Sequence, residues 1–288
     1  MPRINFLDPI LGEHDLDSPL NTAAPAGSVL DQVPAGAGPK NLVRLELPPL
    51  LIVGSGGGVG TTATTLGIAA AAATTQHTGT DVVAVDATAC GGNLARRGAD
   101  AQVSVATIQT WLATPQPGLR SAVNACTGRS STGVKVLTRS PDPLPFGDTV
   151  VSVRHHLAAA HCAPVFDGGN AVSSRLIAPL IADARVGLAL VVSARADSLN
   201  SLNETLGYLV DRHGEWLIGR IVIVVCHQLP GGFGAGAVEH VRTHLAKWVR
   251  AVEEIPYDRH LAAGGVLIWE RLEDATRTAY RHILGGLS

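Results

Sequence analysis

Aromatic and charged residues are scarce in this chain of 288 residues, at 4% and 16%, whereas hydrophobic residues make up 46%. A core with so few aromatics must be filled by Val, Leu, Ile and Ala, the usual filling of buried parallel sheets. The formal net charge is −2, so the overall charge does not attract a polyanion such as DNA. The composition therefore predicts a globular protein with an aliphatic core and gives no strong nucleic-acid signal.

Cysteine is sparse as well. The four cysteines stand far apart: Cys90, Cys126, Cys162 and Cys226. They form no C-x-x-C pair, which argues against a disulfide framework and against a paired-cysteine zinc site. Histidines gather at 155–161 and at 240–244, without an H-E-x-x-H pattern. We therefore expect no zinc.

Long apolar runs are missing too. No run reaches the roughly 18 apolar residues that a membrane-spanning helix needs. Residues 1–17 carry acids where a signal peptide needs an apolar segment. We therefore expect no transmembrane segment and a cytoplasmic protein, which reaches a membrane only if a partner recruits it.

The chain divides into a tail, residues 1–47, and a folded domain, residues 48–288. Residues 18–40 are rich in Pro, Ala and Gly and lack hydrophobic periodicity, which predicts a flexible linker. Ahead of the linker, residues 4–11 form a small apolar island. Two interpretations of the island remain: a disordered terminus, or a peptide that docks on a partner or on the body of the protein.

Apolar runs alternate with helix-like segments from position 50 onward. The expected strands cover residues 50–53, 81–86, 133–138, 163–167, 186–194, 220–227 and 252–257. The expected helices cover residues 61–75, 149–160, 173–184, 198–212, 237–249 and 271–284. Such alternation implies right-handed crossovers and a parallel sheet with helices on both faces. The sequence therefore predicts an α/β fold, with three α/β/α layers around a mainly parallel sheet of about seven strands.

A glycine-rich segment, GSGGGVG, joins the first expected strand to the first expected helix. Glycines let the backbone turn tightly and leave no side chain between the amides and an anion. The N–H groups at the helix start then point at phosphate oxygens. This context predicts a phosphate-binding loop. The plain alternative is a glycine-rich turn that binds nothing.

One candidate pattern is the dinucleotide fingerprint G-x-G-x-x-G/A. It fails in both registers, because its third glycine falls on Val59 or on Thr61. Asp86, at the end of the second expected strand, would nevertheless suit a ribose. A dinucleotide-binding oxidoreductase is therefore kept as an alternative, although NAD is not expected.

The other candidate pattern is K-G-G-x-G-K-[ST]-T. The run Gly57-Gly58-Val59-Gly60 fits its centre, and Thr62 falls on the hydroxyl that binds Mg²⁺. Both lysines of the pattern are missing, because Gly56 and Thr61 stand in their places.

This second pattern is that of the MinD/ParA group of deviant-Walker ATPases. Residues 48–288 resemble this group, and they are most similar to its divergent members, which are common in actinobacteria. The segment DATACGGNL resembles the family motif DxDxxxxNL, with Asp86 as the first acid and Thr88 in place of the second, which positions water. APVFDGG resembles the Walker B strand, with Asp167 as the acid that reaches Mg²⁺ through water.

The resemblance also covers the segments beside the nucleotide base. In RIVIVVCHQLPG, Cys226 replaces the family's base-contacting asparagine. VEEIPYDRHLAAGG is similar to the family's "IPYD" segment, which lies beside the base. The resemblance implies a nucleotide site built from Gly56, Gly57, Gly58, Val59, Gly60, Thr61, Thr62, Cys226, Pro256, Tyr257 and Asp258. It implies a Mg²⁺ site at Thr62, Asp86 and Asp167.

The replaced residues weaken the expected chemistry. A lysine on the phosphates makes a charge-assisted bond worth about 1.5–3 kcal/mol. The family's signature lysine, which Gly56 replaces, crosses a dimer interface and acts much like an arginine finger. Such a group increases the rate by about 10³–10⁵-fold. Because Thr61 and Thr88 replace the expected lysine and acid, no catalytic residue is assigned. We predict weak binding of ATP or ADP with Mg²⁺ and no efficient hydrolysis.

The function hypothesis is a pseudo-ATPase that acts as a scaffold or positioning factor. Members of the group serve partition, septum placement, pilus assembly, secretion or conjugation, which implies protein partners from such a system and a homodimer. The alternative is a working ATPase with compensating charges. Arg96 and Arg97 are candidates for those charges, or else solvated surface residues.

The last helix is expected to pack against the sheet rather than on a membrane, through Leu272, Ala275, Ala279, Ile283 and Leu284.

Overall fold

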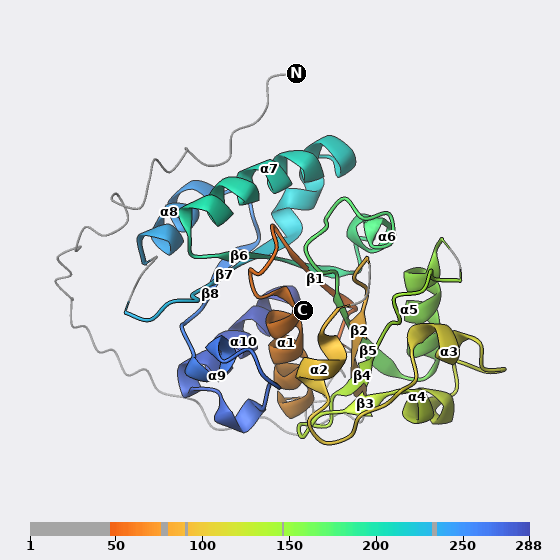
Figure 1. Cartoon of the computed structure of the whole chain (residues 1–288). Helices are drawn as coiled ribbons and strands as arrows, with labels where there is room; N and C mark the ends of the chain where they lie inside the picture. The colour runs from red at the N-terminus through yellow and green to blue at the C-terminus, as the bar shows by residue number, and fades with distance from the viewer. Residues whose placement is uncertain (1–46, 76–79, 90–91, 146, 232–234) are drawn as a thin grey trace, which may run out of the picture.

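The computed structural model describes residues 47–75, 80–89, 92–145, 147–231 and 235–288. Their strands form one eight-stranded sheet in the order β3-β4-β2-β5-β1-β6-β7-β8. Helices cover both faces of the sheet (Figure 1). All neighbouring strands are parallel except β3, which runs antiparallel to β4. The predicted three-layer α/β/α fold is confirmed, with one strand more than expected.

The strands are β1 Leu50–Gly54, β2 Asp81–Asp86, β3 Gly128–Arg129, β4 Lys135–Leu137, β5 Cys162–Asp167, β6 Gly187–Ser193, β7 Ile221–Cys226 and β8 Ala251–Ile255. The α-helices are α1 Thr61–Thr75, α2 Leu94–Gly98, α3 Ile108–Leu112, α4 Arg120–Cys126, α5 Thr149–Ala159, α6 Ala178–Ala182, α7 Ala196–His213, α8 Ala235–Leu245, α9 Arg259–Ala262 and α10 Asp274–Leu287. Two 3-10 turns are η2 Glu215–Arg220 and η3 Trp269–Arg271.

Alternate residues of β1 belong to two different cores. Leu51 and Val53 join the apolar cluster under α5, α6, α7 and α8. Leu50 and Ile52 join the cluster under α1 and α10. Successive side chains of a strand point to opposite faces, so a sheet covered on both sides needs apolar residues at every position. This explains why the strands read as unbroken aliphatic runs.

Several element boundaries differ from those expected. The helix expected at 173–184 is shortened to α6, which begins one residue before Pro179, because proline suits only the first turn of a helix. β8 ends before Pro256, which has no N–H for the sheet. The short elements β3, α2, α3, α4 and α9 were not expected.

Helix α10 packs on α1 and the sheet, as expected, and three of the five expected contact residues, Leu272, Ile283 and Leu284, are buried. Its buried residues are Thr276, Tyr280, Ile283, Leu284 and Leu287, whereas Ala275 is exposed. No helix in the described part of the chain is long and apolar enough to span a bilayer. The expected linker 18–40 and apolar island 4–11 lie outside the described residues.

Gly67 allows α10 to approach α1. A Cβ atom at Gly67 would overlap the ring of Tyr280, which is fully buried. We expect Gly67→Ala to lower the free energy of unfolding by about 1–3 kcal/mol, because overpacking forces the ring or the helix to move. Denaturant unfolding measures the change.

Gly207 is the matched control for Gly67. It lies inside α7, and a Cβ atom there meets nothing within 4 Å. Gly207→Ala is expected to be neutral or to stabilise by up to about 1 kcal/mol, since alanine is the better helix former. Equal effects of the two substitutions would contradict the role given to Gly67.

Candidate nucleotide-binding site

The glycine-rich loop between β1 and α1 depends on glycine at two positions. Gly58 and Gly60 have φ angles of +76° and +101°, which side-chain-bearing residues rarely adopt. The side chain of Gln228 donates to the carbonyl oxygen of Gly58, and the N–H of Gly54 donates to Gly169 at 2.7 Å. The loop is thus fixed at its apex and at its base. It leads directly to the first N–H groups of α1, which a helix leaves without intrahelical partners.

Two carboxylates stand beside the start of α1. Asp86 and Asp167 end the neighbouring strands β2 and β5 and are paired in register. Thr62 Oγ1 donates to Asp167 Oδ2 at 2.7 Å, and the N–H of Gly169 donates to Oδ1 at 3.0 Å. Mg²⁺ is usually held by one or two carboxylates together with substrate phosphates and water. Thr62, Asp86 and Asp167 therefore fit a Mg²⁺ ion that accompanies a bound phosphate chain.

Burial raises the pKa of Asp167 from its ordinary value of 3.8 to about 6. The hydrogen bonds from Thr62 and Gly169 oppose the rise, the charge of Asp86 adds to it, and the charge of Arg97 opposes it. A fully buried carboxylate with a raised pKa, next to a phosphate loop, is typical of a functional site rather than of a structural ion pair.

Thr88 holds the carboxylate of Asp86 through two hydrogen bonds. Its N–H and Oγ1 donate to Asp86 Oδ1 at 3.1 and 2.6 Å, while Gly92 N donates to Oδ2 at 2.8 Å. The Thr88 hydroxyl therefore acts as a donor that holds Asp86. It lacks the second acceptor oxygen and the charge of a carboxylate.

Thr61 also has a packing role. It is buried, with 7% of its surface exposed, and its carbonyl accepts a hydrogen bond from Thr65 Oγ1. A Cβ atom at Gly54 would overlap its hydroxyl. The position that the loop pattern assigns to a lysine is thus occupied by a small uncharged side chain against the first glycine.

A cavity of about 320 Å³ lies beside the loop, over the ends of β7 and β8. Its wall contains Gly58, Gly60 and Cys226, and Tyr280 from α10. Burial raises the pKa of Cys226 to about 12, and its Sγ lies 3.7 Å from Thr64 Oγ1. Cys226 therefore presents an uncharged thiol, which lacks the paired acceptor and donors with which an asparagine amide reads a base.

The "IPYD" segment contributes to this cavity only in part. Asp258 and the preceding Ile255 line it, but Pro256 and Tyr257 do not. Asp258 is buried and caps α9: its Oδ1 accepts from the N–H groups of His260 and Leu261, and its Oδ2 accepts from the N–H of Glu273. The carboxylate thus joins β8, α9 and the start of α10.

A second cavity of about 320 Å³ lies on the other side of the loop. It is bounded by Gly56 and Gly57 and by Arg195 and Ser198 near the start of α7. A Cβ atom at Gly56 would meet only Val59, at 3.9 Å. The position of the family's signature lysine therefore has room for a side chain, so packing does not explain the glycine.

The two arginines considered from the sequence have different surroundings. Arg96 is exposed, in agreement with a solvated surface residue. Arg97 is partly buried and lines the cavity beside the loop. A third arginine was not expected: Arg139 donates to the carbonyl oxygen of Thr88, and its buried Nε has no partner among the described residues. Its place just beyond the end of β4 was the only sequence signal for it.

No group of three His, Cys, Asp or Glu side chains that could hold a metal ion occurs within the described ranges. His240 and His244 stack on α8 with ring centroids 4.2 Å apart, and His244 Nδ1 lies 2.8 Å from the carbonyl oxygen of His240. The pair is therefore engaged with itself and its helix.

The chain matches no family model and no curated protein, but it is similar to solved structures. The ParA family ATPase from Chlorobium tepidum has a TM-score of 0.62 at 16% sequence identity, over 83% of this chain and 98% of that chain. A chain of the MinC:MinD cell division protein complex from Aquifex aeolicus has 0.58 at 17%, over 83% and 96%. Cobyrinic acid a,c-diamide synthase from Mycobacterium smegmatis, with bound ATP analog and magnesium, has 0.55 at 14%, over 83% and 92%.

These similarities define the fold as that of a P-loop NTPase. Within this class the arrangement is MinD/ParA-like, as the resemblance of residues 48–288 implied. The strand order differs from that of the dinucleotide-binding fold, because β5 lies between β1 and β2 here, whereas the first two strands are neighbours in that fold. The oxidoreductase alternative therefore loses its support from the fold.

Proposed function

We propose that this chain is a MinD/ParA-like pseudo-ATPase that binds ATP or ADP with Mg²⁺ weakly and works as a scaffold or positioning factor. The supporting observation is a contrast within one site. The positive-φ glycines and the Thr62–Asp167 hydrogen bond keep the geometry of a phosphate and Mg²⁺ site. Thr61 and Thr88, at the expected positions of a lysine and an acid, are instead engaged in packing and in holding Asp86.

Hydrolysis is the step that suffers most from these replacements. Catalysis of phosphoryl transfer rests on positioning and on charge that stabilises the transition state. Without an acid at Thr88 the attacking water is not oriented, which removes the gain from proximity. Such losses do not add independently, because the groups act as a unit. Backbone N–H groups still bind phosphate. The protein therefore keeps nucleotide binding although it loses hydrolysis.

The role in positioning rests on the similar structures. One of them is a cell division complex of two proteins, MinC and MinD, and another is a putative plasmid partition protein from Borrelia burgdorferi bound to AMPPNP. By analogy we assign this chain a protein partner from a partition, septum-placement, secretion, conjugation or pilus system. In this proposal the chain also forms a homodimer, and the two copies meet across the surface that carries the glycine-rich loop.

Calorimetry with ATP, ADP and NAD, each with and without Mg²⁺, tests binding, and phosphate release tests turnover. We expect both adenine nucleotides to bind in the submillimolar to millimolar range, with phosphate release no faster than in buffer. Binding of NAD alone would contradict the proposal. Turnover that disappears in Asp167→Ala would contradict its pseudo-ATPase part.

A working ATPase with compensating charges is the second candidate. The observation in its favour is that Arg97 lines the cavity and that Arg139 lies beside Thr88. The turnover assay separates the two candidates, and repeating it with a candidate partner present shows whether a second protein supplies the missing charge.

A further inference from the structure

Arg97 is the arginine that lines the cavity beside the loop. Its side chain lines that cavity together with Gly58, Gly60 and Thr64. Its Nε donates to the carbonyl oxygen of Gly265 at 3.4 Å, and no carboxylate of the described residues forms an ion pair with it. The guanidinium therefore has donors to spare at the edge of a phosphate loop.

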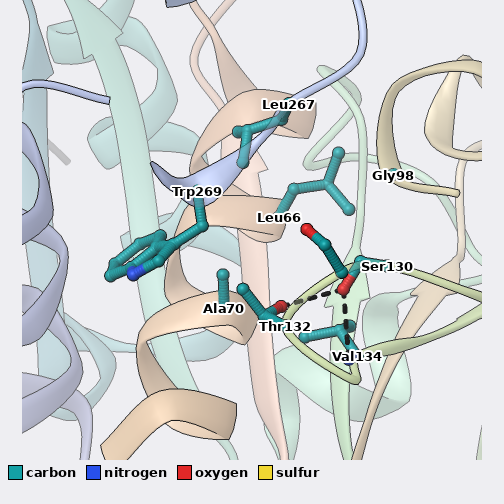
Figure 2. A pocket seen from close by; sticks show the side chains of 9 residues that line it. Leu66, Ala70, Gly98, Ser130, Thr132, Val134, Leu267 and Trp269 are labelled. Carbon is teal, nitrogen blue, oxygen red and sulfur yellow. Dashed lines mark hydrogen bonds between the residues drawn. The ribbon is translucent and has the colours of Figure 1, made fainter. Parts of the chain in front are cut away.

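The backbone of Arg97 is held tightly in place. Its carbonyl oxygen accepts from the N–H of Leu267 at 2.7 Å. The next residue, Gly98, lies so close to Leu66 of α1 that a Cβ atom there would stand 2.6 Å from Leu66 Cδ2. Figure 2 shows this junction, where Leu66 and Ala70 of α1 lie between Trp269 and the β3–β4 turn. A fixed backbone leaves only the side chain of Arg97 to be ordered when a ligand binds.

The effects of Arg97 on its neighbours agree with this position. Its charge lowers the pKa of Asp167, against the larger rise that burial causes. It also lowers the pKa of Tyr280, which burial and Cys226 raise. Tyr280 lines the same cavity as Arg97.

The other side of the loop holds no comparable cation among the described residues. The second cavity, next to Gly56, contains Arg195, which forms an ion pair with Asp197 at 3.3 Å. Arg139 lines neither cavity; it donates to the carbonyl oxygen of Thr88. Of the arginines that line the two cavities beside the loop, Arg97 is thus the one without a carboxylate partner among the described residues.

We propose that Arg97 binds the phosphates next to the nucleoside, so that this site holds nucleoside diphosphates about as tightly as triphosphates. The inference rests on the proposed nucleotide binding. A third phosphate, beyond the first two, would reach the loop where Gly56 and Thr61 offer no cation, and so it adds little. Binding is then insensitive to whether the terminal phosphate is present, and the nucleotide acts as a constant structural component rather than a switch.

The test compares the dissociation constants of Mg²⁺-ADP and Mg²⁺-ATP in the full chain and in variants. In the unaltered protein we expect the two constants to agree within about threefold. Arg97→Ala should weaken both by about ten- to a hundredfold, because a charge-assisted bond is lost. Arg96→Ala, the exposed neighbour on the same helix, is the matched control and should change neither by more than about twofold. Arg97→Lys keeps the charge and should recover part of the affinity.

Three results would overturn the inference while the proposed function stands. One is ATP binding more than about tenfold tighter than ADP in the unaltered protein. Another is an Arg97→Ala variant that binds like Arg96→Ala. A third is a loss of affinity in Arg97→Ala that only follows a fall in the unfolding temperature of the ligand-free protein. Failure of the unaltered protein to bind either nucleotide would overturn the proposed function and the inference together.

Discussion

Asp167→Asn is expected to stabilise the ligand-free protein at pH 8 by about 1–3 kcal/mol. The pKa of Asp167 rises from 3.8 to about 6 on folding. A carboxyl with a raised folded pKa contributes stability that is fully present below the unfolded pKa and is lost as pH rises through the folded pKa. Stability should therefore fall between about pH 4 and pH 6 in the unaltered protein, and this fall should shrink in the variant. Denaturant unfolding across that pH range measures both effects.

The same substitution should remove the Mg²⁺-dependent part of nucleotide binding, because an amide is a poor ligand for Mg²⁺. Asp86→Asn is the matched control on the neighbouring strand. Asp86 accepts three hydrogen bonds through both oxygens, and an amide nitrogen would face a donor, so this variant should lose about 1–3 kcal/mol. An Asp167→Asn variant that is less stable than the unaltered protein at pH 8 would show that the buried charge is not the dominant effect.

Thr61→Lys is expected to tighten the binding of Mg²⁺-ATP by about ten- to a hundredfold, since it restores a charge-assisted bond to the phosphates. The position lies at the start of α1, directly after Gly60, where N–H groups already face the loop. The longer side chain must leave its contact with Gly54 and extend over the loop. Titration of the variant with ATP, ADP and inorganic phosphate measures the gain.

Thr61→Met is the control for Thr61→Lys, because it adds similar length without charge. It should bind ATP no more tightly than the unaltered protein. We expect Thr61→Lys to remain without efficient turnover, because Gly56 and Thr88 still lack the other two groups. If Thr61→Met tightens binding as much as Thr61→Lys, space rather than charge limits the site.

The long elements of the fold were predictable, whereas the short ones were not. Helix α1 was expected with the boundaries that it has, because a glycine loop precedes it and its alanine-rich sequence contains no charged residue and no proline. The helix α2 and the strand β3 have five and two residues, too few to show a period in the sequence. Their positions depend on tertiary contacts such as that of Gly98 with Leu66.

The candidate site was predictable where the chain order alone places residues at one edge of the sheet. Asp86 and Asp167 end parallel strands, so their proximity follows from the topology. Arg97 and Arg139 were harder to interpret, because their place depends on the packing of α2 and on a loop after β4. The sequence predicts Asp258 as a nucleotide contact, but it does not show that the carboxylate also accepts N–H groups from α9 and from Glu273 before α10.

The two outer strands of the sheet carry a consequence for self-association of the chain. β3 has only two residues and runs antiparallel to β4, with Gln102 bridged to Arg129. β8, at the opposite edge, carries the adjacent acids Glu253 and Glu254. Short or charged outer strands hinder the addition of a strand from another molecule. Crowded folded copies should therefore resist fibril-like growth along this sheet.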